Sequence, residues 1–155
     1  MPKVVLFEPE IPPNTGNIAR TCAATGTELH LVEPLGFEIS DRQLRRAGLD
    51  YWPHVRLVRH QNWPLFVSHR NASGGRLVAL STHASDSYLD FRFRDSDWLL
   101  FGRESSGLPQ TARGDCDNLL SVPLACAEVR SLNLSVAVAV VLFEAIRQIQ
   151  KPVQH

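Results

Sequence analysis

The chain has 155 residues, 44% of them hydrophobic and 21% charged, with 16 Lys and Arg against 16 Asp and Glu. This length suits one domain with a hydrophobic core of its own, which we expect to span residues 1–155, and it excludes a second full domain. The neutral balance excludes attraction of nucleic acid through overall charge, and leaves two local clusters, Arg42–Arg46 and His54–His60, as either RNA contacts or ordinary solvated faces.

The N-terminal part of the sequence predicts a strand, a helix and a second strand. The β-branched and aromatic run Val4–Phe7 suits a central strand, and the prolines after it require an extended loop. Asn14 or Thr15 is then expected to cap a helix that Gly26 ends, and Leu29–Val32 resumes as a strand. This order is that of a βαβ unit.

The middle of the chain alternates in the same way. Ser40–Gln43 has the form of a capping box, which opens a short helix ending at Gly48. Val55–Val58 is predicted to be the third strand. Pro64 stands in the first turn of the next helix, which Gly74 separates from a further strand.

The strand after Gly74 is predicted over Leu77–Leu80, and two more strands over Trp98–Phe101 and Leu119–Val122. A long helix over Ser131–Gln148 completes the pattern. Short apolar strands that alternate with helices predict an α/β fold, a parallel sheet with helices on both faces. The last helix is apolar almost all round and needs two neighbours, so we expect a second copy of the chain in a homodimer. Its apolar stretch is too short to cross a bilayer and contains Glu144, which predicts no membrane span.

Neither cysteine nor histidine spacing indicates a metal site. Cys22, Cys116 and Cys126 lack a CxxC pair, and the six histidines lack HxH or HxxxH spacing. We therefore predict no metal and reduced cysteines, as in a cytoplasmic protein. No cleavable apolar segment precedes the first strand, which agrees with that location.

Three polar loops that each lead from a strand into a helix hold the most unusual residues: Asn14–Arg20, Gly102–Pro109 and Arg130–Ser135. Glycine and asparagine permit tight turns, and a helix N-terminus offers unpaired N–H groups to an anion or a carbonyl-rich ligand. Because ligands of parallel sheets bind outside the carboxyl ends of the strands, the loops are predicted to form one pocket. Taken singly, the first loop is better explained as a capped helix start, and the other two can be a tight turn and a helix cap; their joint occurrence favours a pocket.

Three familiar kinds of site are disfavoured by the spacing of the residues. Ser105 and Ser106 lie between glycines but do not fit the GxSxG nucleophile elbow, and no motif supplies a histidine partner. Neither GxxxxGK[ST] nor GxGxxG occurs in the chain. A serine hydrolase, an ordinary NTPase and a Rossmann dinucleotide enzyme are therefore disfavoured.

Together the three loops resemble the SPOUT superfamily of RNA methyltransferases. Its ribose-methylating branch carries N-x-G-N-x-x-R, G-x-E-x-x-G-L-P and R-S-x-N-x-S motifs, which Asn14–Arg20, Gly102–Pro109 and Arg130–Ser135 match in order. Glu8–Ile18 and Arg45–Tyr51 further resemble the small single-domain branch that methylates the tRNA wobble nucleotide. The resemblance covers nearly the whole chain.

The resemblance implies a C-terminal deep trefoil knot and S-adenosylmethionine bound in a bent form at a dimer interface. Carried over motif by motif, the cofactor-binding residues are Leu80, Gly102, Glu104, Gly107, Val122, Ser131 and Leu132. Glu104 is expected to hold the second loop by accepting N–H bonds. Ser131 and Asn133 are expected to cap the last helix.

Arg20 is the expected catalytic residue, because the matching arginine of the family is held to activate the ribose 2′-hydroxyl. A guanidinium keeps its proton at any working pH and is a poor base, so an equally physical role is to grip a phosphate and stabilise the developing alkoxide. Asn17, three residues earlier on the same helix face, is expected to orient Arg20. The expected RNA contacts are Asn14, Arg45, Arg46 and Arg130, of which the last has the cofactor carboxylate as an alternative partner.

The implied reaction is 2′-O-methylation of the wobble pyrimidine nucleotide of tRNA, with leucine tRNAs as expected substrates and the anticodon loop as partner. Only RNA has a 2′-hydroxyl, and a single-stranded loop exposes its nucleotides. Ribose methylation at another tRNA or rRNA position and a non-catalytic RNA-binding module are the alternatives. Four positions differ from the pattern of the branch: Arg103, Ser106, Val136 and Phe143.

Overall fold

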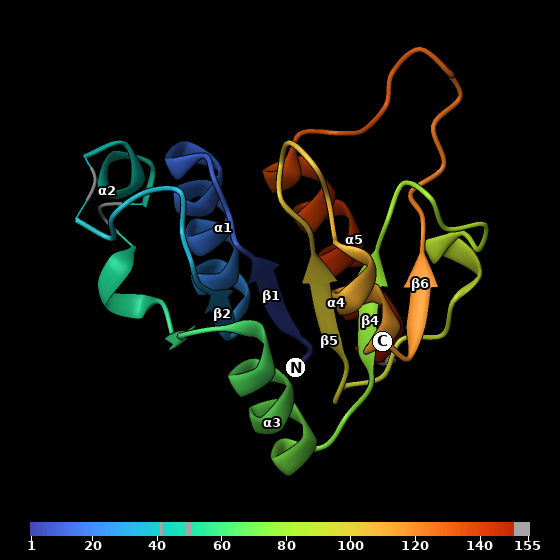
Figure 1. Ribbon diagram of the computed structural model, residues 1–155, viewed down its shortest axis with the longest axis horizontal. Helices are drawn as coiled ribbons and strands as arrows, with labels where there is room; N and C mark the ends of the chain where they lie inside the picture. Colours follow the sequence, from blue (N-terminus) through green and yellow to red (C-terminus); the bar gives the residue numbers. More distant parts are fainter. Residues whose placement is uncertain (41, 49–50, 151–155) are drawn as a thin grey trace, which may run out of the picture.

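A computed structural model describes residues 1–40, 42–48 and 51–150, without the side chains of residues 45, 47 and 48. In this part of the chain six parallel strands form one sheet: β1 (Lys3–Phe7), β2 (Leu29–Val32), β3 (Leu57–His60), β4 (Leu77–Leu80), β5 (Trp98–Phe101) and β6 (Asn118–Leu120). Their order is β3-β2-β1-β5-β4-β6, and Figure 1 shows β2 to β6 side by side in that order. The predicted parallel α/β fold is confirmed.

Helices cover both faces of this sheet. α1 (Pro12–Thr25) and α5 (Leu134–Ile149) pack on one face, and α3 (Trp63–Ser73) and α4 (Gln110–Gly114) pack on the other. The short helix α2 (Arg42–Gly48) lies along α1. In this three-layer arrangement the helices bury both faces of the sheet.

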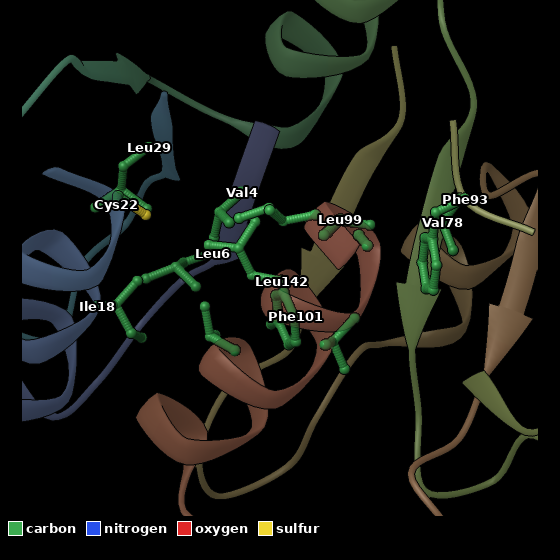
Figure 2. Close-up of a cluster of buried hydrophobic side chains, with 14 of the residues drawn as sticks. Val4, Leu6, Ile18, Cys22, Leu29, Val78, Phe93, Leu99, Phe101 and Leu142 are labelled. Atoms are coloured by element: carbon green, nitrogen blue, oxygen red, sulfur yellow. The ribbon is translucent and has the colours of Figure 1, made fainter. Parts of the chain in front are cut away.

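Side chains of each strand alternate between two cores. Val4 and Leu6 of β1 belong to the core under α1 and α5, whereas Val5 and Phe7 belong to the core under α3 and α4. Figure 2 shows the first core, in which Ile18 of α1 and residues of α5 meet the strands. Burial on both faces is the reason that the strands are continuous apolar runs in the sequence.

The start of α1 differs from the sequence prediction. Ile11 is the N-cap and makes no side-chain cap bond, and two prolines occupy the first turn. Proline suits this position because its missing N–H has no helical partner there and its φ angle is already helical. Asn14 and Thr15 are therefore buried inside the helix rather than capping it. Gly26 ends the helix with φ 68°, as predicted.

Three other boundaries are shifted. β3 begins at Leu57 rather than Val55, because Trp52–His54 forms a short 3-10 helix that Val55 closes. β6 covers Asn118–Leu120 instead of Leu119–Val122. α5 begins at Leu134, with Asn133 alone as its N-cap: the Asn133 side chain accepts the Ser135 N–H, and Ser131 takes no part. The predicted capping box includes Asp41, which lies outside the described residues.

Two further expectations concern the membrane and the cysteines. Among the described residues, the helices are all too short or too polar to cross a membrane. Cys22, Cys116 and Cys126 are free thiols. Burial raises the pKa of the Cys22 thiol to about 12, so it behaves as a core side chain rather than a nucleophile.

Candidate functional site at the carboxyl edge of the sheet

The three motif segments lie at one edge of the sheet. Asn14–Arg20 was expected to be a loop that leads into a helix, but it lies inside α1, whereas the other two segments are loops. The three segments follow β1, β5 and β6, and all strands are parallel, so each of them comes after a carboxyl end. β1 and β5 are neighbours, yet the helices that follow them, α1 and α4, pack on opposite faces. Parallel sheets bind ligands at the carboxyl edge, where neighbouring strands lead to helices on opposite faces, so this is the expected place for a ligand.

Asn14 connects all three loops. Its side-chain amide donates to the Glu104 carboxylate at 3.5 Å, and its carbonyl oxygen accepts the Asn133 amide at 3.1 Å. These partners are 90 and 119 residues away along the chain. The side chain of Asn14 is only 7% exposed, so water competes little for these bonds. The loops predicted to share a pocket are thus in contact.

Glu104 holds the start of α1. Its carboxylate accepts the backbone N–H of Glu10 at 2.9 Å and of Ile11 at 3.1 Å. The first N–H groups at a helix start have no partner within the helix and favour a negative charge, so a carboxylate is suited to this place. Glu104 accepts N–H bonds as expected, but their donors belong to the segment between β1 and α1 rather than to its own loop.

Two further carboxylates, those of Glu10 and Glu8, bind residues of the second loop. Sequence reasoning missed these contacts. Glu10 accepts the N–H of Ser105 at 3.0 Å and its hydroxyl at 2.7 Å. These two bonds lower the pKa of Glu10, the backbone bond most. Arg103 pairs with Glu8 at 2.9 Å and lies over the Phe7 ring at 4.9 Å from its centroid. No sequence signal specified these partners, although the two glutamates lie in the stretch that resembles the wobble branch.

Two glycines shape the second loop. Arg103 and Gly107 exchange backbone N–H bonds of 3.1 and 3.0 Å. A Cβ on Gly102 would lie 2.4 Å from the Gly107 carbonyl carbon, and Gly107 has φ 67°. Both positions therefore require glycine, the first for close approach and the second for its left-handed backbone.

Arg20 is exposed on α1, two turns into the helix that Asn14 anchors. Its guanidinium lies 4.7 Å from the centroid of the Tyr51 ring. Among the described residues no carboxylate pairs with it. Asn17 is also exposed, and its side chain makes no bond to Arg20 in the described part of the chain, so the predicted orienting contact is absent. Tyr51, which sequence reasoning missed, lies where that contact was expected.

The remaining predicted site residues differ in their exposure to solvent. Leu80 at the end of β4 and Val122 beyond β6 are half-buried and pack against the core. Leu132 is half-buried, while Arg46, Arg130 and Ser131 are exposed. The side chain of Arg45 lies outside the described residues.

Several side chains of the His54–His60 cluster have partners within the protein. Arg56 donates to the carbonyl of Gly26, and Arg59 pairs with Glu33. His60 is 6% exposed. The interpretation of an ordinary face with internal partners is the better one here, whereas Arg42 and Arg46 of the other cluster are exposed on α2.

Comparison with known proteins agrees with the three motifs. The SpoU rRNA Methylase family matches residues 1–143. This chain belongs to that family. A Synechocystis protein is 53% identical over 150 residues, which cover 97% of this chain and 98% of that protein. The tRNA (cytidine(34)-2'-O)-methyltransferase of Polaromonas sp. is 49% identical over 147 residues, which cover 94% of this chain and 89% of the relative.

Solved structures of related proteins share the fold. A structure reported for the 2-OH methylation of C/U34 on tRNA superposes with a TM-score of 0.89 at 49% identity, over 94% of both chains. An AdoMet-bound rRNA methyltransferase from Sinorhizobium meliloti superposes with a TM-score of 0.87 at 28% identity, over 96% of this chain and 57% of that one. The resemblance stated from the motifs is confirmed at the level of the family.

Proposed function

We propose that this chain transfers a methyl group from S-adenosylmethionine to the ribose 2′-hydroxyl of nucleotide 34, the wobble position, of tRNA. The observation that carries the proposal is the hydrogen-bonded link Glu104–Asn14–Asn133, which joins one residue of each motif at the start of the helix that carries the exposed Arg20. The names of the Polaromonas relative and of the C/U34 structure support this nucleotide. Leucine tRNAs are proposed as substrates on the resemblance of Glu8–Ile18 and Arg45–Tyr51 to the wobble branch.

The residues at the carboxyl edge fit the cofactor. Leu80 and Val122 offer half-buried apolar surface suited to an adenine ring. The loop closed by Gly102 and Gly107 brings backbone groups close to the same edge. The AdoMet-bound Sinorhizobium structure supports this assignment. When bound, S-adenosylmethionine supplies a methyl group already activated on a sulfonium.

The residues of the chain then have to position the ribose. Arg20 has a charge without a carboxylate partner among the described residues, so it is available to hold the phosphate beside nucleotide 34. From there its N–H groups stabilise the negative charge that develops on the 2′-oxygen. Because Glu104 and Asn133 fix the first turn of α1 through Asn14, the position of Arg20 relative to the cofactor loops is set before RNA binds. The Tyr51 ring lies against the guanidinium and limits its movement.

The RNA and the partner subunit complete the proposal. Exposed Arg46 and Arg130 bind phosphates of the anticodon loop, together with Arg45. Asn14, also expected to contact RNA, is buried and bonded to Glu104 and Asn133, so its role is to hold the segments together. A second copy of the chain packs on α5, where Val136 is 48% and Phe143 54% exposed. These side chains are seven positions apart and share one stripe of the helix, opposite its buried face. A C-terminal trefoil knot and a cytoplasmic location belong to the same proposal.

The deciding experiment methylates total tRNA from cells that lack this protein, with labelled donor and nucleotide-resolution mapping. We expect label at nucleotide 34, and a loss of about a hundredfold or more in rate for Arg20→Ala, the scale of removing one electrostatic stabiliser. Arg92→Ala, which removes an exposed arginine elsewhere, is the matched control. Label at another nucleotide would favour a different RNA target. Tight donor binding without transfer to any cellular RNA would favour a non-catalytic module.

A further inference from the structure

Three histidines that are remote in the sequence meet on the face of the sheet covered by α3. His30 of β2 and His60 of β3 are 1% and 6% exposed, and His69 of α3 is exposed. One ring nitrogen of each lies within 4.8 Å of the others. This cluster lies on the opposite face from α1 and Arg20, and the proposed methyl transfer does not use it.

The two buried rings already face each other through their nitrogens. His30 Nδ1 and His60 Nε2 are 2.8 Å apart, and the ring planes differ by 13°. Neutral imidazoles at this distance share a single proton. A tetrahedral metal with bonds of about 2.0–2.1 Å places its ligand nitrogens roughly 3.3 Å apart. The two nitrogens therefore have to move apart by about 0.5 Å for a metal to replace that proton. The exposed side chain of His69 is free to rotate inward as a third ligand.

The outer nitrogen of His30 gives an independent indication. His30 Nε2 is buried and has no hydrogen-bond partner, and a Glu28 carboxylate oxygen lies 3.5 Å from it. If His30 binds a metal through Nδ1, its proton moves to Nε2 and points to Glu28. Metal-bound histidines commonly donate their other N–H to a carboxylate in this way, which fixes the ring and strengthens the ligand.

The charges around the cluster are balanced. Glu28 brings a negative charge toward His30, whereas the Lys3 ammonium lies over the Trp98 ring at 4.5 Å from its centroid. Trp98 in turn packs edge-on against His30, with ring centroids 4.8 Å apart. Three imidazoles and a single nearby carboxylate suit a borderline transition metal and not Mg²⁺ or Ca²⁺, which prefer oxygen ligands.

We propose that His30, His60 and His69 bind one divalent transition metal ion of the Zn²⁺, Co²⁺ or Ni²⁺ class, with Glu28 orienting His30. The ion ties the outer strands β2 and β3 to α3. Its role is structural, because the site lies away from the motif loops. The spacing that led us to predict no metal from the sequence misses these residues, which are 30 and 9 positions apart.

The test titrates chelator-treated full-length protein with Co²⁺, read by visible absorption, and with Zn²⁺, read by calorimetry. We expect one ion per chain and a thermal midpoint that rises with Zn²⁺. His69→Ala should weaken binding by at least tenfold, and Glu28→Gln by about tenfold, the lower end for an outer carboxylate partner. His54→Ala and His83→Ala replace exposed histidines outside the cluster and should bind as wild type does.

Folding and metal binding are separated by the choice of variant. Because His69 is exposed, His69→Ala should keep its circular dichroism spectrum and its transfer of methyl groups to tRNA. The proposal is overturned if the wild-type chain shows no saturable binding of either ion up to millimolar concentration. It is equally overturned if His69→Ala binds as tightly as wild type, or if His83→Ala weakens binding to the same degree.

Discussion

Replacing Glu104 by alanine should destabilise the protein far more than loss of a half-exposed glutamate normally does. The substitution leaves the N–H groups of Glu10 and Ile11 without their acceptor, since both bonds, of 2.9 and 3.1 Å, end on this carboxylate. Hydrogen bonds to a charged group contribute about 1.5–3 kcal/mol each, and partial exposure argues for the lower value. Two bonds give about 3 kcal/mol, and the charge at the helix start adds about 0.5 kcal/mol.

Urea unfolding measures this loss directly. With a slope of about 2 kcal/mol/M, Glu104→Ala should lower the urea midpoint by about 1.5–2 M at an unchanged slope. Glu128→Ala, an exposed glutamate on the loop before α5, should change stability by less than about 0.5 kcal/mol. If the two variants unfold at the same urea concentration, the carboxylate does not hold the first loop, and the account of how α1 is positioned fails.

Three further outcomes follow from the same contacts. Val136→Asp and Phe143→Asp should each convert the dimer to a monomer in sedimentation. Leu89→Asp, which places a charge on another exposed apolar position, should remain a dimer. If all three variants are dimers, the α5 interface is refuted. Binding of tRNA should weaken steeply as salt rises, because phosphate contacts release counterions, and a flat salt response would contradict it. Hydrogen bonds from Arg147 lower the pKa of Glu144 to about 2, so Arg147→Gln should raise it toward 4.5 in an NMR titration. The carboxylate is charged and paired above pH 4.5 and loses this contribution as pH falls toward 2. The contribution is small because the Arg147 side chain is 71% exposed.

Most of the fold was predictable because strands buried on both faces are apolar throughout. The strands β1, β2, β4 and β5 were identified in this way. β3 was misplaced because Val55 has a high strand propensity but is used to close a 3-10 helix, while pairing with β2 starts at Leu57. β6 was misplaced because Asn118 joins the sheet through its backbone, opposite Val78, and an apolar pattern does not register a polar residue there.

The motifs identified which residues gather at the site but not which of them touch. Asn14, Glu104 and Asn133 were each singled out, yet their bonds span 90 and 119 residues, and no local pattern specifies them. The expected contact between Asn17 and Arg20 relied on helical spacing, which makes two side chains neighbours without making them bond. The Arg20 guanidinium instead lies against Tyr51, which folds back from beyond α2.

Arg103 shows how one departure from the family pattern is accommodated. Proline is common at this position of the branch, whereas here the guanidinium pairs with Glu8 and lies over Phe7. Glu8 has φ 45°, a left-handed backbone that is unfavourable for glutamate, so the ion pair helps to hold the first loop in that conformation. A charge used in this way is not available to RNA. Arg20 and Arg130 are exposed and have no carboxylate partner among the described residues, so their charges are available for the proposed phosphate contacts although the net charge of the chain is zero.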